Sequence, residues 1–324
     1  MRNTGCLPSC EAAELSGQTP QLRRISIMGC ELEAKGYLCT ADGVQYPDKG
    51  PETRLQLTIC PTSRCDCRCP FCIAENTEEE VRPDPAKLEK VLLYLRDRKL
   101  VRGVSFTGGE PFLDPGFLDE LVSLVFSVFG PHMEVSISTN GSHITELGRI
   151  RELSRIDAIH ISRHHDDDRI NRRLFGGGPV PDAAVLKKAI AEVPWKDLFV
   201  FNCLLLKDGI GTVEDVHRYL AFAADMGVPK TAFITGMPAN AWVQEQTMDY
   251  REVLRRDDPS LLFTRGFRDH TWCRCQDGIF VTEDNRLVEF YGRSTDTSGC
   301  PYVRGLVYTA DDHLRSGFGG KVIV

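Results

Sequence analysis

The stretch Cys65-Asp66-Cys67-Arg68-Cys69-Pro70-Phe71-Cys72 places four cysteines within eight residues. Three of them keep the spacing Cys65-x3-Cys69-x2-Cys72. Three thiolates on one tight loop can hold three irons of a 4Fe4S cluster and leave the fourth iron open, whereas four cysteine ligands would close the cluster. Short cysteine runs also bind zinc, although usually as two separated pairs. The loop alone therefore favours an iron-sulfur site and leaves zinc as an alternative.

A second motif follows the cysteine loop, with the sequence Val104-Ser105-Phe106-Thr107-Gly108-Gly109-Glu110-Pro111. Its apolar run predicts a buried strand that ends in a Gly-Gly turn. Glycines at a strand end let the backbone approach a ligand closely and expose N–H groups. Glu110 offers an acceptor for an ammonium group. The turn alone is weak evidence, and its position after the cysteine loop makes it informative.

The two motifs together resemble the radical S-adenosylmethionine (SAM) superfamily, over roughly residues 55–238 by motif order and strand rhythm. The resemblance implies a 4Fe4S cluster on Cys65, Cys69 and Cys72, whose open iron chelates the amino and carboxylate groups of SAM. It also implies that the Gly-Gly-Glu-Pro strand helps to hold the amino group and that an aromatic residue lies beside SAM. The SAM contacts implied at these two motifs are Phe71, Gly108, Gly109 and Glu110.

The rest of the chain alternates between short apolar runs and amphipathic stretches, which predicts strands followed by helices. Right-handed helical crossovers join parallel neighbours, so six such units predict an α/β fold with a parallel sheet. We expect a partial (βα)6 TIM-like barrel with its site at the C-terminal ends of the strands. The expected strands are 55–59, 103–107, 134–139, 158–162, 199–205 and 230–235. The expected helices are 87–95, 118–128, 183–190 and 213–226.

Three regions are expected along the chain. Residues 1–50 form an N-terminal extension, in which 25–28 and the segment around Gly36 suggest a small sheet or hairpin. Residues 51–238 form the barrel, and 239–324 form a C-terminal, cysteine-containing appendage. The cysteines of the N-terminal extension are interpreted as free or core thiols. They are Cys6, Cys10, Cys30 and Cys39. Cys60 and Cys67 share the cluster loop but miss its spacing, so both are left out of the ligand set.

Composition narrows the class of protein. With 324 residues and 42% hydrophobic content, the chain can bury a core larger than that of one average domain. Neither an export signal nor an apolar run long enough to span a membrane is found. Its 13 cysteines therefore indicate a reducing cytoplasm, where thiols bind metal or stay free. A net charge of −7 without a basic block makes a nucleic-acid substrate an unfavoured interpretation.

Further SAM contacts follow from the resemblance, one strand end at a time. Thr139 and Asn140 lie in a Thr-Asn-Gly turn, which the superfamily often places beside the SAM ribose or the substrate. Ser162 ends the next strand, where relatives use serine to touch SAM. Met237 begins a Met-Pro pair after the sixth strand, as in relatives that contact the adenine there. Each match is weak alone, and together they predict one pocket at the strand ends.

The group closest in pattern is the GTP cyclases of molybdenum-cofactor biosynthesis, whose sixth strand also runs into Met-Pro. Those enzymes hold a triphosphate with arginines, and bidentate guanidinium contacts are not easily replaced. Two of the arginine positions are Thr58 and Ser105 here. The chain therefore resembles these cyclases in scaffold, but it is not expected to cyclise GTP.

The C-terminal cysteines resemble the second-cluster segment of the same group, but with altered spacing. The first pair is Cys273-x-Cys275, the position of the third cysteine is Glu289, and Cys300 lies farther on. An auxiliary iron-sulfur cluster on Cys273, Cys275 and Cys300 is one interpretation. Structural thiols or a zinc site are equally open alternatives.

The segment Ile161-Ser162-Arg163-His164-His165-Asp166 is the expected place for substrate recognition, because relatives commonly have Ser-Leu-Asp there. Arg163 could clamp a carboxylate or phosphate, and His164 or His165 could act as acid or base near neutral pH. The alternative for either histidine is a hydrophilic loop after a strand.

The mechanism implied by the resemblance begins with an electron delivered to the cluster by a reducing partner such as flavodoxin or ferredoxin. SAM is then cleaved to methionine and a 5′-deoxyadenosyl radical, which abstracts hydrogen from the substrate. The first hypothesis for that substrate is a small metabolite or nucleotide in a biosynthetic pathway, and the second is a peptide. The third hypothesis is a nonenzymatic iron-sulfur or zinc protein. The complete cysteine triplet, with Phe71 and Glu110, argues against the third.

Overall fold

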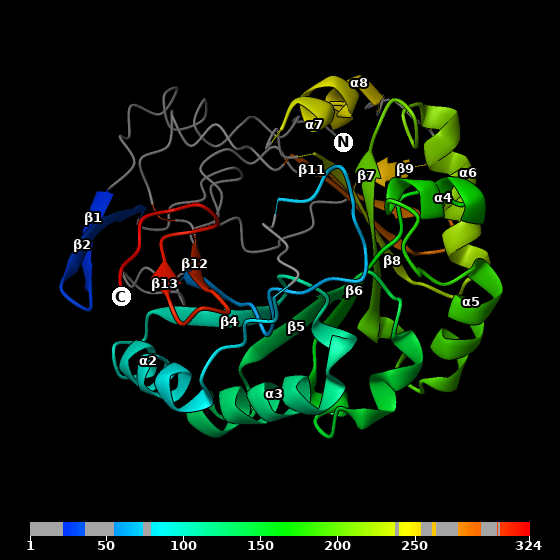
Figure 1. The fold of residues 1–324 in the computed structure, drawn as a ribbon. Helices are drawn as coiled ribbons and strands as arrows, with labels where there is room; N and C mark the ends of the chain where they lie inside the picture. Colours follow the sequence, from blue (N-terminus) through cyan, green and yellow to red (C-terminus); the bar gives the residue numbers. More distant parts are fainter. Residues whose placement is uncertain are drawn as a thin grey trace.

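The computed structural model describes residues 22–35, 55–73, 79–236, 240–253, 261–263, 278–292, 303 and 305–324. Its main feature is a curved sheet of parallel strands with helices along its outer face (Figure 1). The parallel strands are β3 (Leu55–Ile59), β4 (Val101–Phe106), β5 (Glu134–Thr139), β6 (Ala158–Ser162), β7 (Phe199–Leu205), β8 (Lys230–Thr235), β11 (Leu287–Gly292) and β12 (Gly305–Tyr308). The α/β class predicted from the sequence is confirmed.

Helices follow the strands as the sequence pattern predicts. The α-helices are α2 (Pro85–Asp97), α3 (Pro115–Phe129), α4 (Asp168–Leu174), α5 (Ala183–Glu192), α6 (Val213–Asp225), α7 (Ala241–Gln246) and α8 (Tyr250–Val253). The 3-10 helices are η1 (Pro111–Leu113), η2 (Ile144–Arg149), η3 (Leu153–Arg155) and η4 (Lys196–Leu198). Among the described helices, none has the length and hydropathy that a membrane span requires.

The strand order is β13-β12-β3-β4-β5-β6-β7-β8-β11-β10-β9. Neighbours from β12 to β11 are parallel, while β13 (Leu314–Arg315), β10 (Gly278–Thr282) and β9 (Leu261–Phe263) pair antiparallel at the two edges. Within the described ranges no pairing joins β9 to β13, so the sheet is an open, partial barrel.

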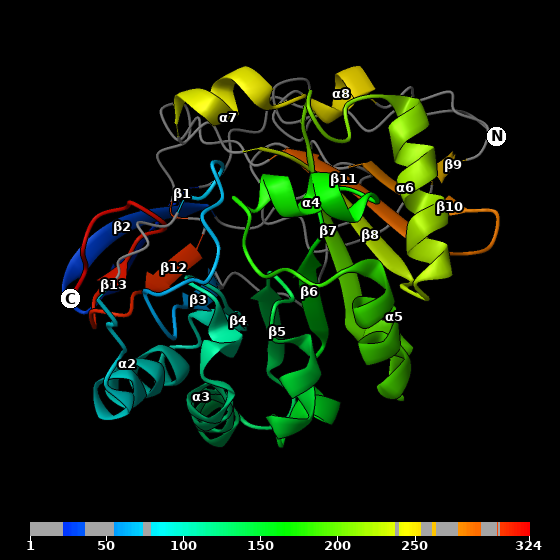
Figure 2. The same cartoon turned by 45° about the vertical axis from the view of Figure 1, so that its right-hand side comes forward.

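The C-terminal region contributes strands to both edges of the expected six-stranded sheet. β12 pairs with β3 at one edge, and β11 pairs with β8 at the other. Figure 2 shows these late strands on either side of the central strands. Residues beyond 239 therefore extend the barrel sheet as well as following it in sequence.

Local sequence explains where the helices start. Asp84 caps α2 by accepting a hydrogen bond from the Ala86 N–H, and Pro85 occupies the first turn, where its missing N–H costs nothing. α6 begins with a capping box between Thr212 and Asp215. The apolar faces of the helices then pack on the outer face of the sheet. The residues that α2 buries there are Leu88, Val91, Leu92 and Leu95.

The two faces of the sheet differ in chemistry. On β3 the outward residues Leu55, Leu57 and Ile59 are buried beneath helices, whereas Gln56 and Thr58 point to the inner face. The same alternation places the side chains of Ser105, Ser136, Ser138 and His160 on the inner face. The interior of the partial barrel is therefore lined by polar groups as the strands approach their C-terminal ends.

Strand β7 shows the same alternation between the two faces. Cys203 is buried in the core on the helix side, while Val200 and Leu204 belong to a small apolar cluster on the inner face. Asn202 lies on the inner face with them and is hydrogen-bonded to His160, with 3.3 Å between Oδ1 and Nδ1.

A separate hairpin precedes the barrel. β1 (Leu22–Ile27) pairs antiparallel with β2 (Cys30–Lys35), as the expectation of a small sheet or hairpin suggested, and the segment around Gly36 lies outside the described residues. Ile27 belongs to the main core, and the Met28 N–H donates to the Tyr94 hydroxyl of α2 at 2.8 Å. The hairpin is thus attached to the outer layer of the barrel.

Candidate active site

The cysteine loop follows β3 and lies at the C-terminal end of the parallel sheet. Cys65, Cys69 and Cys72 are all half-buried, and the Cys72 N–H donates to the Cys69 carbonyl at 3.1 Å, which closes a turn. Cys67 differs because it is only 1% exposed. The three cysteines with the expected spacing are therefore accessible from outside the loop, while the fourth is seated in the core.

The seat of Cys67 is formed by a glycine run after α4. A Cβ atom at Gly178 would lie 2.5 Å from Cys67 Sγ, and the thiol packs with Phe175 and Val180. Cys60, the other thiol left outside the ligand set, is also buried, and this burial raises its pKa to about 12. Cys60 therefore remains a protonated core thiol at neutral pH.

The Gly-Gly turn after β4 lies directly against the cysteine loop. The Gly109 N–H donates to the Thr62 carbonyl at 3.1 Å, and the Glu110 N–H donates to the Arg64 carbonyl at 2.8 Å. A Cβ atom at Gly109 would lie 1.8 Å from the Arg64 carbonyl oxygen. This oxygen belongs to the backbone and cannot move aside. Glycine is therefore required there for close backbone approach, as its sequence position suggested.

The Glu110 residue is 1% exposed, and its carboxylate links its own turn to the turn after β5. Oε1 accepts from the Phe112 N–H at 3.0 Å and the Thr139 hydroxyl at 2.6 Å, and Oε2 accepts from the Asn140 N–H at 2.7 Å. Burial raises the pKa of Glu110 to about 7, although these hydrogen bonds act to lower it. Oε2 keeps a lone pair that could accept from an ammonium group.

The Thr139-Asn140 turn after β5 connects Glu110 to the cysteine loop. The Asn140 side-chain amide donates to Asp66 Oδ1 at 2.7 Å, and it lies 3.3 Å from Cys67 Sγ and 3.8 Å from Cys65 Sγ. Asp66 and Cys67 were not among the predicted site residues. The structure thus brings the cysteine loop, the Gly-Gly-Glu turn and the Thr-Asn turn together at one place.

Arg163 has contacts that differ from the predicted substrate clamp. Its guanidinium donates to the carbonyls of His165, Asp166 and Pro181 at 2.7, 3.1 and 3.1 Å. It also pairs with Asp168 at 2.6 Å, and the residue is only 2% exposed. Because these donors are used within the protein, the geometry supports a role in holding the loop after β6 instead of contact with a substrate.

His164 is 4% exposed and lies among aromatic rings. Its ring stacks on Phe175 at 4.9 Å between centroids and meets the edge of Phe71 at 4.7 Å. Nδ1 accepts from the Leu204 N–H at 3.1 Å, which places the ring proton on Nε2. Burial, with Arg163 nearby, lowers the pKa of His164 to about 3. The ring is therefore neutral near pH 7, which does not fit the predicted role as an acid or base.

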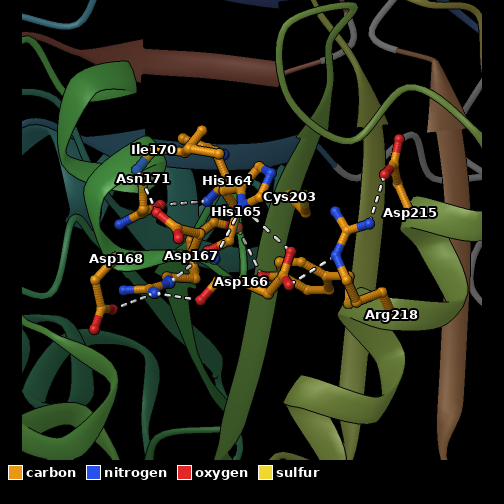
Figure 3. Close-up of polar contacts among 12 residues, drawn as sticks. His164, His165, Asp166, Asp167, Asp168, Ile170, Asn171, Cys203, Asp215 and Arg218 are labelled. Atoms are coloured by element: carbon orange, nitrogen blue, oxygen red, sulfur yellow. Dashed lines mark hydrogen bonds and ion pairs between the residues drawn. The ribbon is translucent and has the colours of Figure 1, made fainter.

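His165 belongs to the charged network shown in Figure 3. Its Nδ1 accepts from the Asp167 N–H at 2.9 Å and lies 3.2 Å from Asp166 Oδ1. Asp166 in turn pairs with Arg218 of α6 at 2.8 Å. Burial lowers the pKa of His165. These contacts connect the loop after β6 to α6. They support a role for His165 in holding this loop, instead of the predicted role as acid or base.

Other predicted residues divide between the site and the undescribed part of the chain. Ser162 lies at the end of β6, paired in register with Asn202 on the inner face. The remaining predictions lie outside the described residues: Met237, Cys273, Cys275 and Cys300. The auxiliary cluster therefore stays a prediction.

Two residues near Phe71 were missed by sequence reasoning. Trp242 of α7 lies 6.2 Å from Phe71 between ring centroids, and Asn240 donates to the Pro70 carbonyl at 2.9 Å. No local motif marks either residue. Both residues reach the cysteine loop because the chain after β8 turns back over the strand ends, and the sequence does not reveal this turn.

The donor set fits a cluster with three protein ligands. Three accessible thiols stand on one loop, Phe71 lies immediately before the last of them, and a buried carboxylate lies on the adjacent turn. A sequence profile described as the Radical SAM superfamily matches residues 59–250, more than half of the chain. The chain therefore belongs to the radical SAM superfamily, whose enzymes use a 4Fe4S cluster and SAM.

Individual relatives are more distant. A probable GTP 3′,8-cyclase of Thermococcus kodakarensis is 27% identical over 179 residues, 55% of this chain and 55% of that protein. GTP 3′,8-cyclase 2 of Mycobacterium bovis is 31% identical over 239 residues, 66% of this chain and 61% of that protein. The chain thus spans less than two thirds of the length of either relative.

The fold is also found in a solved structure. The crystal structure of SuiB from Streptococcus suis bound to S-adenosylmethionine aligns with a TM-score of 0.54 and 15% identity. The alignment covers 82% of this chain and 60% of that chain. At this level of identity, the similarity concerns the fold.

Proposed function

We propose that this radical SAM enzyme abstracts hydrogen from a small, polar metabolite and does not cyclise GTP. One observation carries the proposal. The hydroxyls of Thr58 and Ser105, which stand where the GTP cyclases have arginines, lie 3.1 Å apart on neighbouring strands. Two short hydroxyls bonded to each other cannot replace two guanidinium groups that bind a triphosphate.

The remaining inner face supports the same type of substrate. Ser136 continues the row formed by Thr58 and Ser105, Ser138 and His160 form the next inner-face row, and Asn202 lies one row farther toward the strand ends. Strands β3 and β5 to β7 carry no arginine or lysine on the inner face, and β8 carries Lys230 there, in register with Val200. Hydroxyl and amide groups suit a substrate with hydroxyl, amide or carbonyl groups.

Glu289 of β11 adds a carboxylate to this face. It pairs in register with Ala232, which is the partner of Asn202, so all three residues share one row. Lys230 of β8 and Glu134 of β5 lie on the same face, two residues before Ala232 and Ser136, so Glu289 is one of three charged groups there. A carboxylate in the row nearest the strand ends would favour a substrate with an amino group. We therefore include an amine among the expected substrate groups.

The chain's own residues would prepare the site. Cys65, Cys69 and Cys72 would hold the cluster, and Glu110 would accept from the SAM amino group. When bound, the cluster and SAM would supply the radical chemistry that removes hydrogen from the substrate carbon. Phe71 would cover one side of SAM and exclude water from the reacting atoms.

The test is anaerobic reconstitution of the cluster, followed by addition of SAM and dithionite. We expect 5′-deoxyadenosine from the wild type and none from the Cys65→Ala variant. Absence of 5′-deoxyadenosine from a fully loaded wild type would reject the chemistry. Deuterated amino sugars, amino acids and polyols are then screened for deuterium transfer into 5′-deoxyadenosine, with GTP deuterated at the ribose as comparison. Transfer from GTP would reject the proposed substrate class.

The inner-face hydroxyls allow a sharper test once a deuterium donor is found. Thr58→Val keeps the side-chain shape but removes the hydroxyl that meets Ser105. We expect KM for the donor to rise roughly threefold to tenfold, the range for one lost hydrogen bond. SAM cleavage without the donor should be unchanged, and an unchanged KM would contradict contact between this row and the substrate.

A further inference from the structure

Three consecutive residues of the cysteine loop bring their ligand atoms together. The Cys65 thiol, an Asp66 carboxylate oxygen and the Cys67 thiol all lie within 4.8 Å of one another. Donor atoms around a tetrahedral zinc ion are separated by about 3.3–3.8 Å, given zinc bonds of 2.0–2.3 Å. Only a small contraction would therefore let the three atoms share one ion.

The second residue of this group has an unused acceptor. Asp66 Oδ2 is buried and accepts no hydrogen bond, whereas Oδ1, which lies 3.9 Å from Cys65 Sγ, accepts from Asn140 at 2.7 Å. His143 Nε2 lies 3.3 Å from Oδ2 and can orient the carboxylate from outside. A buried carboxylate oxygen without a hydrogen bond is costly unless a ligand satisfies it.

The third residue is held in position from two sides. Cys67 is seated against Gly178, and its Sγ lies 3.3 Å from the Asn140 amide. The same amide reaches both Asp66 and Cys65. One side chain outside the loop therefore orients all three donors, in the way that outer residues orient metal ligands.

We propose that, in the cluster-free chain, Cys65, Asp66 and Cys67 bind one zinc ion, with water completing the tetrahedron. The inference rests on the proposed function, in which Cys65 also holds the 4Fe4S cluster. Because Cys65 belongs to both donor sets, zinc and the cluster exclude each other. Zinc bound here occupies Cys65 and therefore prevents the 4Fe4S cluster from being loaded onto the loop.

The two donor sets differ in residues that can be changed separately. Cys67 and Asp66 belong only to the zinc site, whereas Cys69 and Cys72 belong only to the cluster. The full chain is prepared without iron under anaerobic conditions, and zinc affinity is measured by competition with a chromophoric chelator. Cobalt is added in parallel, because its thiolate absorption reports cysteine ligation.

We expect Cys67→Ser and Asp66→Asn to weaken zinc binding by at least about tenfold, because loss of a residue that only orients a metal ligand already costs about tenfold in affinity. Both variants should still take up a 4Fe4S cluster. The Cys69→Ala/Cys72→Ala double variant should bind zinc like the wild type and take up no cluster at the loop. Cys30→Ser, in the distant hairpin strand β2, is the control and should change neither property.

Two results would overturn the proposal. One is wild-type zinc affinity in both Cys67→Ser and Asp66→Asn, and the other is loss of zinc binding in the Cys69→Ala/Cys72→Ala variant. Circular dichroism of each variant distinguishes loss of a zinc ligand from loss of the fold. If Cys67→Ser does not fold, Asp66→Asn still tests the site, because the new side chain keeps an oxygen that can accept from the Asn140 amide. Failure of the proposed function would appear separately, as a loaded wild type that cleaves no SAM.

Discussion

Glu110 makes the stability of this protein depend on pH in a direction opposite to that of an ordinary paired carboxylate. Burial raises its pKa from 4.5 to about 7, against three hydrogen bonds that lower it. The folded chain therefore holds the proton more tightly than the unfolded chain. The resulting stability is fully present below pH 4.5 and is lost as pH rises through 7.

The size of the loss follows from the same two pKa values. A shift of one pKa unit corresponds to about 1.4 kcal/mol, so the loss between pH 5 and pH 8 is about 2–3 kcal/mol. Glu110→Gln does not titrate. The stability advantage of the wild type over this variant should therefore shrink by that amount over the same interval.

The measurement is urea unfolding of the SAM-free protein at pH 5, 6, 7 and 8, under anaerobic conditions. Glu120→Gln, which changes an exposed carboxylate of α3, is the matched control and should follow the wild type. An advantage that stays constant, or grows, from pH 5 to pH 8 would refute the reasoning. It would mean that the three hydrogen bonds outweigh burial.

Three further predictions concern the residues around the cysteine loop. Gly178→Ala should lower the free energy of unfolding by roughly 1–3 kcal/mol in urea, because its Cβ has no space, whereas Gly148→Ala, which meets no atom within 4 Å, should stay within about 0.5 kcal/mol. His164 should show an unchanged ring ¹⁵N signal of the Nε2–H form from pH 5 to pH 9, and a titration in that range would contradict its burial. Arg163→Met should cost roughly 3 kcal/mol of unfolding free energy by leaving buried acceptors unpaired, while exposed Arg169→Met should cost less than about 0.5 kcal/mol; equal losses would show that Arg163 does not hold its loop.

The central strands could be predicted from sequence because their residues alternate between a helix-covered core and a polar interior. Five of the six expected strands match the structure at both ends, and β4 is displaced to 101–106. β11 and β12 were not predicted. They pair with β8 and β3 across long stretches of chain, and no local pattern reveals such a pairing.

Residue types in the site were easier to predict than their roles. The cysteine loop, Glu110 and Asn140 meet as expected, because parallel strands end at the same edge. The role of Arg163 was not accessible, since its partners include Pro181, far along the chain. The charge of His164 was equally hidden, because it depends on burial and on the Leu204 N–H of the next strand.

The position of the cysteine loop is set by backbone contacts on two sides. A Cβ atom at Gly109 would lie 1.8 Å from the Arg64 carbonyl oxygen, and one at Gly176 would lie 2.2 Å from the Arg68 carbonyl oxygen. Backbone contacts therefore fix the loop, and the Cys67 side chain, buried against Gly178, adds a further contact. With the loop held in this way, the substrate choice that we propose depends on the inner face of the sheet, where Thr58 and Ser105 carry hydroxyls.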